Sequence, residues 1–181
     1  MNFEELSGYS IDKNTTCIQV SGEDSQKFLQ GQFSNDITEV TDSVYQYSSY
    51  STNQGKVIAI FRILKNNQGY LLLINKDVAK YFIERLSMYI LMSKVIIEEQ
   101  KDCKIYGVLG KSANNILLNN ILKENEYIKS SDNIILNNKN KYMPAATIIK
   151  IKSNNSESDE LLQSEINVDY NVNELIDNLL L

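Results

Sequence analysis

The sequence contains no histidine and only two cysteines, and these shortages exclude several kinds of active site. Without histidine, neither Ser-His-Asp nor Cys-His catalysis can operate, and a histidine-ligated metal site cannot form. Cys17 and Cys103 lie far apart and form no C-x-x-C pair. Two thiols alone are too few to complete a zinc or iron–sulfur site within one chain. We therefore interpret both cysteines as small buried residues of strands.

Glycine-rich phosphate-binding motifs are missing as well. Neither G-x-x-x-x-G-K-[ST] nor G-x-G-x-x-G occurs, so the P-loop and Rossmann interpretations have no support. The net charge of −5 argues against direct nucleic-acid binding, which needs a basic face. No apolar run approaches the roughly 20 residues that cross a bilayer. The first five residues are acidic and lack an apolar signal core, so we expect a cytoplasmic protein without membrane contact.

The residues that are present suit a globular protein with a substantial core. Of 181 residues, 43% are hydrophobic and 23% are charged, and the length allows one domain or two small packed subdomains. Apolar periodicity predicts a helix that ends near residue 31 and further helices at 76–91, 112–122 and 171–181. Alternation predicts strands at 15–20, 45–51, 57–64, 70–74, 94–98, 104–109, 134–136 and 145–151.

This order of elements mixes hairpins with helical crossovers, which favours an α+β fold. The pattern predicts ferredoxin-like split βαβ units with mainly antiparallel sheets. We expect residues 1–100 to form a first subdomain that carries an added strand. Residues 101–181 would form a second α+β subdomain, packed on the first without a linker.

Three stretches, in this order along the chain, are similar to one family. The first spans 20–37 and contains F-L-Q-G-Q-F-S-N-D, the second spans 47–64, and the third spans 86–95 and contains Y-I-L-M-S-K-V. Together they resemble the folate-binding domain shared by YgfZ proteins and glycine-cleavage T-proteins, which are aminomethyltransferases. The arginine usual before K-V is missing, and Met92 and Ser93 stand in that region. The resemblance implies the fold of the aminomethyltransferase folate-binding domain.

The chain departs from this resemblance at two points. In T-proteins the second stretch carries the catalytic carboxylate, but Ala59 and Ile60 stand there, and neither can accept a proton or stabilise an iminium cation. YgfZ proteins lack that carboxylate too. They carry a K-G-C-x-x-G-Q-E motif in their C-terminal half, and this sequence ends before any such motif. We therefore expect the N-terminal portion of a YgfZ-type protein, with an incomplete second subdomain.

The resemblance implies tetrahydrofolate as the ligand. A folate needs an aromatic or apolar slot, polar groups at the pterin edge and a cation for its carboxylate tail. Tyr47 matches the tyrosine of the family's slot, Asn35 and Asp36 would form a polar wall, and Arg62 and Lys94 are the candidate cations. Each of these residues also has a purely structural interpretation. Tyr47 can pack against aromatic residues of a neighbouring strand, and Asn35 and Asp36 can cap a helix or form a turn. Arg62 can form an ion pair within the chain, and Lys94 can lie exposed at the start of a strand.

The resemblance also implies a function: a folate-binding protein without catalytic residues, in iron–sulfur cluster assembly or repair and the tRNA modification that depends on it. One alternative is an aminomethyltransferase enzyme that works with the lipoyl-carrying H-protein. Another is a fold remnant that acts only through protein contacts.

A separate expectation concerns the C-terminal helix, where five aliphatic residues form one apolar stripe. They are Val172, Leu175, Ile176, Leu179 and Leu180. This stripe either packs on the chain's own sheet or mediates contact with a partner chain or a homo-oligomer.

Overall fold

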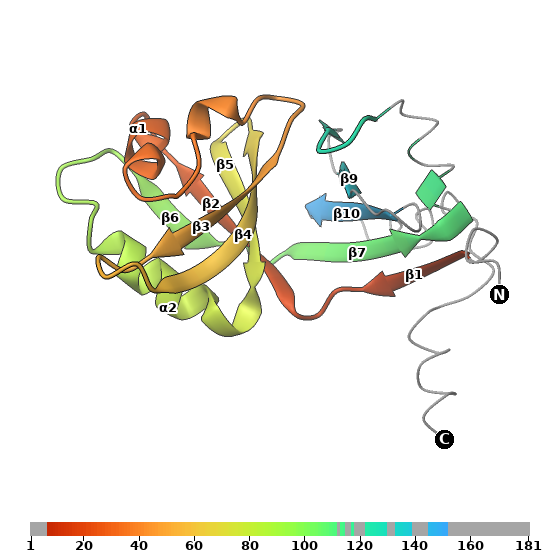
Figure 1. Cartoon of the computed structure of the whole chain (residues 1–181), viewed down its shortest axis with the longest axis horizontal. Helices are drawn as coiled ribbons and strands as arrows, with labels where there is room; N and C mark the ends of the chain where they lie inside the picture. Colours follow the sequence, from red (N-terminus) through yellow and green to blue (C-terminus); the bar gives the residue numbers. More distant parts are fainter. Residues whose placement is uncertain are drawn as a thin grey trace, which may run out of the picture. The chain divides into compact units, whose positions relative to one another are not determined.

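The computed structural model describes residues 7–111, 113–114, 117, 122–129, 133–138 and 145–151. The chain divides into two compact units, one of Lys13–Lys101 and one of Met1–Asp12 with Asp102–Leu181 (Figure 1). The junction at Lys101 adjoins the predicted boundary at residue 100. At the N-terminus the structure differs from our expectation, because strand β1 (Ser7–Ile11) pairs with β7 (Cys103–Leu109) and so belongs to the second unit.

The Lys13–Lys101 unit is built on a five-stranded antiparallel sheet in the order β3-β4-β5-β2-β6. Without the edge strand β3, this is the strand order of a ferredoxin-like split βαβ unit, which confirms the predicted fold with its added strand. Helix α1 follows β2, and helix α2 follows β5. The bounds are β2 Thr15–Ser21, α1 Ser25–Gln30, β3 Gln46–Ser51, β4 Val57–Asn66, β5 Gly69–Asn75, α2 Lys76–Ser87 and β6 Ile96–Glu99.

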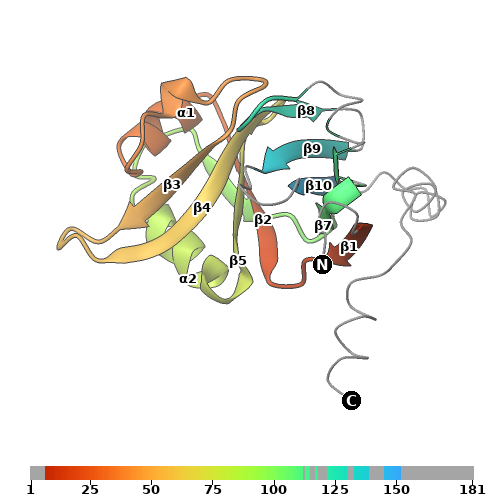
Figure 2. The ribbon, with the colours of Figure 1, turned by 45° about the vertical axis from the view of Figure 1, so that its right-hand side comes forward.

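Both helices cover the same face of this sheet, and the core lies between them and the strands (Figures 1 and 2). Four aromatic rings meet at its centre. The ring of Phe82 in α2 stands 5.5 Å from those of Tyr50 and Phe61, and Phe33 lies 4.6 Å from Phe61. Edge-on and tilted contacts at such separations are favourable for aromatic quadrupoles. The alternating apolar residues of β4 and the periodic ones of α2 therefore meet as their spacing predicts.

The hairpin between β4 and β5 is fixed by one glycine and one buried amide. Gly69 has φ of +137°, and a Cβ there would collide with the carbonyl oxygen of Val20. Gln19 is only 2% exposed, and its amide exchanges hydrogen bonds of 2.7 and 3.2 Å with the side chain of Asn66. It also donates to the carbonyl of Tyr70 at 3.1 Å. These bonds satisfy the buried amide and hold β2 against the hairpin.

The second unit contains another five-stranded antiparallel sheet, in the order β1-β7-β10-β9-β8. Its further strands are β8 Tyr127–Lys129, β9 Asn133–Asn138 and β10 Ala145–Ile151. Three of the strands agree with those predicted near 104–109, 134–136 and 145–151. The predicted helix at 112–122 falls mostly outside the described residues, and the predicted C-terminal helix at 171–181 falls wholly outside them. None of the described helices is long and apolar enough to cross a membrane.

Candidate functional site

Tyr47 and Arg62 lie directly opposite each other on the neighbouring strands β3 and β4. Directly opposed residues of an antiparallel pair project to the same face, with their Cβ atoms roughly 5 Å apart. The neighbours of Arg62 in the strand, Phe61 and Ile63, belong to the helix-covered core. Because strand residues alternate, Tyr47 and Arg62 project to the other face of the sheet. The structure therefore brings together an aromatic ring and a guanidinium on one face of the sheet.

Tyr47 is partly packed against a neighbouring tyrosine and partly open to solvent. Tyr45 is fully buried, and its ring stands edge-on to that of Tyr47 at 6.2 Å. Tyr47 itself is 55% exposed. Packing against Tyr45 thus supports the ring from one side and leaves more than half of its surface open. Such a ring is a preformed stacking platform.

Asn35 and Asp36 lie at the outer edge of β3, close to Tyr47 in the strand. The backbone amide of Ser34 donates to the carbonyl of Ser49 at 3.0 Å, and Gln46 Nε2 donates to the carbonyl of Asp36 at 2.9 Å. The loop after α1 therefore runs along β3 between these two points. Asn35 lies between them, so both polar residues flank the strand that carries Tyr47.

The carboxylate of Asp36 caps the short 3-10 helix Ile37–Glu39. Its Oδ1 accepts from the backbone amide of Thr38 at 2.9 Å and from the Thr38 hydroxyl at 2.7 Å. These hydrogen bonds, led by that from the hydroxyl, lower the pKa of Asp36 below its ordinary value, since they stabilise the ionised form. The capping interpretation of Asp36 is therefore confirmed, and at neutral pH the capping group is a carboxylate.

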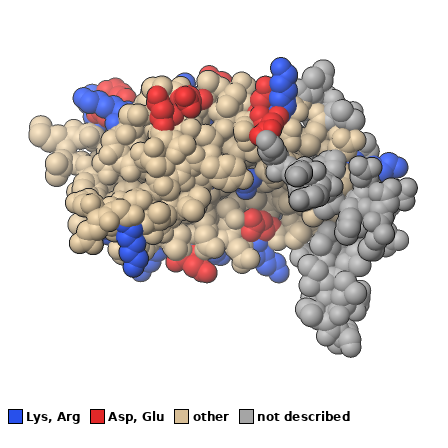
Figure 3. Space-filling view, viewed as in Figure 1, with Lys and Arg blue, Asp and Glu red and all other residues tan. Residues whose placement is uncertain are grey.

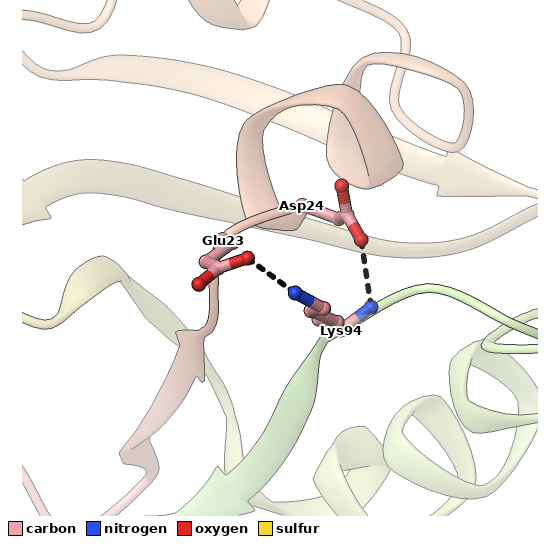
Figure 4. Close-up of polar contacts among 3 residues, drawn as sticks. All are labelled: Glu23, Asp24 and Lys94. Carbon is pink, nitrogen blue, oxygen red and sulfur yellow. Dashed lines mark hydrogen bonds and ion pairs between the residues drawn. The ribbon is translucent and has the colours of Figure 1, made fainter.

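Lys94 lies apart from the other four candidates. Its ammonium pairs with Glu23 at 2.7 Å, and its backbone amide donates to Asp24 Oδ2 at 2.8 Å (Figure 4). Lys94 leads into β6, and the strands β4, β5 and β2 separate β6 from β3. Four strand spacings amount to roughly 19 Å. The structure thus assembles Tyr47, Arg62 and the Asn-Asp pair at one edge, and places Lys94 at the other.

The same contacts explain the role of Asp24. Asp24 is the N-cap residue of α1, but its side chain forms no capping hydrogen bond to that helix. Its carboxylate instead holds the amide of Lys94, which fixes the loop that enters β6. A sequence pattern cannot show this contact, because the two residues are 70 positions apart.

Ala59 and Ile60, which stand in place of the family's catalytic carboxylate, project to opposite faces of β4. Ala59 is 5% exposed and belongs to the core. Ile60 lies opposite Ser49 on the face of Tyr47 and Arg62, and it is 67% exposed. Sequence reasoning noted only the missing carboxylate; the alternation of β4 also indicates that Ile60 contributes an apolar surface to the candidate site.

No family model matches the chain. It is 28% identical over 139 residues to a tRNA-modifying protein YgfZ of Buchnera aphidicola subsp. Baizongia pistaciae, a match that covers 75% of this chain and 44% of the relative. It is 33% identical over 123 residues to the YgfZ protein of Buchnera aphidicola subsp. Schizaphis graminum, covering 66% and 39%. The chain thus spans less than half the length of these curated relatives.

Among solved structures, the chain is similar to the glycine cleavage system aminomethyltransferase T of Bartonella henselae. The TM-score is 0.74 at 13% identity, over 93% of this chain and 47% of that one. This likeness confirms the predicted α+β fold, which the chain shares with the aminomethyltransferase T structure. The sequence matches show that the chain is similar to YgfZ proteins over the matched residues.

Proposed function

We propose that this chain binds a reduced folate, tetrahydrofolate, on the sheet face that carries Tyr47 and Arg62. The cross-strand pairing of these two residues is the observation that carries the proposal. The open ring of Tyr47 suits stacking against a flat heteroaromatic group. The planar guanidinium of Arg62 suits a carboxylate, which it can bind through two parallel hydrogen bonds. Ile60 adds apolar surface beside them.

The polar edge of the site suits the rim of a pterin. The amino group and ring N–H of a pterin are donors, and an ionised carboxylate is purely an acceptor. Asp36 supplies such a carboxylate, since its hydrogen bonds from Thr38 favour ionisation. Asn35 adds an amide with both donor and acceptor groups. When bound, the folate would supply one-carbon chemistry, while these residues bind and orient it.

The site supports binding better than aminomethyl transfer. On the face of Tyr47 and Arg62, position 60 presents the alkyl group of isoleucine, which cannot hold or move a proton. We therefore propose a folate-binding module without transferase activity. The wider role we infer is in iron–sulfur protein assembly or repair in the cytoplasm, on which tRNA modification depends.

In that role the chain would act through partner proteins and not by direct contact with RNA. Cys17 has no exposed surface, so its thiol is not available to a cluster. On the face drawn in Figure 3, basic and acidic side chains lie interspersed over the described surface, which does not suit a phosphate backbone. The alternative is a fold remnant that acts only through protein contacts and binds no folate. A folate titration separates this alternative from a folate-binding module.

The test is calorimetric titration of the purified chain with tetrahydrofolate under reducing conditions. We expect a dissociation constant in the range of roughly micromolar to millimolar, because a site built on the half-exposed ring of Tyr47 desolvates only part of the ligand. Tyr47→Ala should abolish the heat, whereas Tyr81→Ala, which removes a tyrosine of similar exposure from α2, should leave it unchanged. No heat from the parent chain at millimolar ligand would refute folate binding.

A further inference from the structure

One side of helix α2 carries two exposed apolar residues, Tyr81 and Met88, beside a carboxylate and a guanidinium. Tyr81, Glu84, Arg85 and Met88 follow the spacing i, i+3, i+4 and i+7, which places them on one side of the helix. Tyr81 is 52% and Met88 is 63% exposed, whereas Phe82 is fully buried in the core. A solvent-facing helix surface usually carries charged and polar residues instead of a large aromatic and a methionine.

The arginine of this stripe has no acceptor in the described part of the chain. Arg85 forms neither a hydrogen bond nor an ion pair there, and its buried Nε is without a partner. Arg85 lies within electrostatic range of Tyr50, a buried residue of β3. Glu84 borders the same stripe but does not pair with Arg85, because adjacent helical residues are about 100° apart and do not face each other. Arg85 as a whole is of intermediate exposure, so a carboxylate from outside would bind the terminal nitrogens of its guanidinium.

We propose that a second copy of this chain binds here, with the two α2 helices antiparallel across a twofold axis. If the axis passes between positions 84 and 85, Glu84 meets the partner's Arg85 and Tyr81 meets the partner's Met88. Each copy then supplies one carboxylate and one guanidinium, so the charges are complementary at both symmetric positions. The sulfur–aromatic contacts are favourable too. Such a self-complementary pattern identifies a second copy as the occupant, not an unrelated protein.

The segment after the helix supplies apolar area next to this stripe. Leu91 is 91% and Met92 is 97% exposed, and both lie in the segment between the end of α2 at Ser87 and β6. Consecutive large apolar residues at such exposure are typical of contact surfaces. A stable interface needs roughly 800 Å² from each copy, more than a stripe of four residues provides. Residues 88–92 therefore extend the interface beyond the helix.

Sedimentation velocity over a concentration series up to about 1 mM, at low salt, tests this dimer, since salt screens exposed ion pairs. The parent chain should dimerise. Glu84→Arg or Arg85→Glu alone places like charges together at both symmetric positions and should weaken dimerisation roughly tenfold or more. The combined Glu84→Arg/Arg85→Glu chain exchanges the charges and should return to within about threefold of the parent. Lys27→Glu, with the same charge change in α1, is the matched control and should leave the dimer intact.

Two further variants keep the result unambiguous. Met88→Ser alters no charge and should also weaken the dimer, and thermal unfolding confirms that each variant is folded. A parent that stays monomeric throughout, or a dimer that survives both single charge reversals, overturns the proposal. If Leu175→Lys with Leu179→Lys abolishes a dimer that the α2 variants leave intact, the contact involves residues 171–181 instead. Folate titration of the charge variants is independent of these outcomes, since α2 lies on the other face of the sheet.

Discussion

At the scale of single residues, pairing register decides which predicted residues form a site. The sequence places Tyr47 and Arg62 on two strands, and the resemblance suggests both as ligand residues. Their direct opposition depends on the turn between β3 and β4 and on the register shift at Tyr50 and Ser51. A one-residue slip would place the tyrosine and arginine on opposite faces. The types of residue in the site could therefore be predicted, but not which of them meet.

Arg62 gives the first prediction at this scale. Arg62→Ala should weaken tetrahydrofolate binding by roughly tenfold to a hundredfold, because a charge-assisted hydrogen bond contributes about 1.5–3 kcal/mol. Arg62→Lys keeps the charge but lacks the planar fork, so it should restore only part of the affinity. Titration calorimetry measures both. Lys94→Ala removes a cation from the far edge of the sheet and should have no effect; equal losses from Arg62→Ala and Lys94→Ala would contradict the assignment.

Asp36 gives a second prediction. Because hydrogen bonds from Thr38 lower its folded-state pKa, the cap stabilises the fold above the ordinary pKa of 3.8. That contribution is lost as the pH falls through the lowered folded value. NMR titration of the side-chain carboxyl should show Asp36 titrating below 3.8. Thr38→Val removes the hydroxyl donor and should move the pKa upward; an unchanged value would show that the hydroxyl is not responsible.

At the scale of elements, the strands are predicted better than the end of α2. Asn75 caps α2 as its position suggests, with its Oδ1 accepting from the amide of Asp77 at 2.8 Å. The apolar period predicts that α2 continues to residue 91, but it ends at Ser87. The chain must leave the helix early enough to enter β6, whose start is held by the contacts of Lys94 with the β2–α1 turn. The local apolar pattern of a helix does not reveal contacts between residues that are far apart in the sequence.

The β4–β5 hairpin provides a prediction for elements. Gly69→Ala combines a positive φ with a collision against the carbonyl of Val20, and should destabilise the fold by roughly 3 kcal/mol or more. Gly55→Ala is the matched control. Gly55 also has a positive φ of +80°, but a Cβ there meets nothing within 4 Å, so only about 1 kcal/mol should be lost. Urea unfolding measures both, and equal losses would show that the close backbone approach is unimportant.

At the scale of the whole molecule, a shared fold does not imply a shared activity. The chain shares its fold with an aminomethyltransferase at a TM-score of 0.74, yet at 13% identity that likeness carries no activity with it. Both antiparallel sheets could be expected from the order of hairpins and crossovers. The pairing of β1 with β7 in the second unit could not be expected from the sequence. The strand at residues 7–11 is short, and its partner β7 lies more than 90 positions away.

The last prediction is that the chain does not catalyse aminomethyl transfer. With lipoyl H-protein that carries the aminomethyl group, and with tetrahydrofolate, it should release ammonia only at the background rate. The reason is the side chain of Ile60, which occupies the exposed face next to Arg62 without any group that exchanges a proton. Bartonella henselae aminomethyltransferase T is the positive control for the assay. Turnover above background would show that another carboxylate acts, and its loss in Asp36→Asn would identify that group as Asp36.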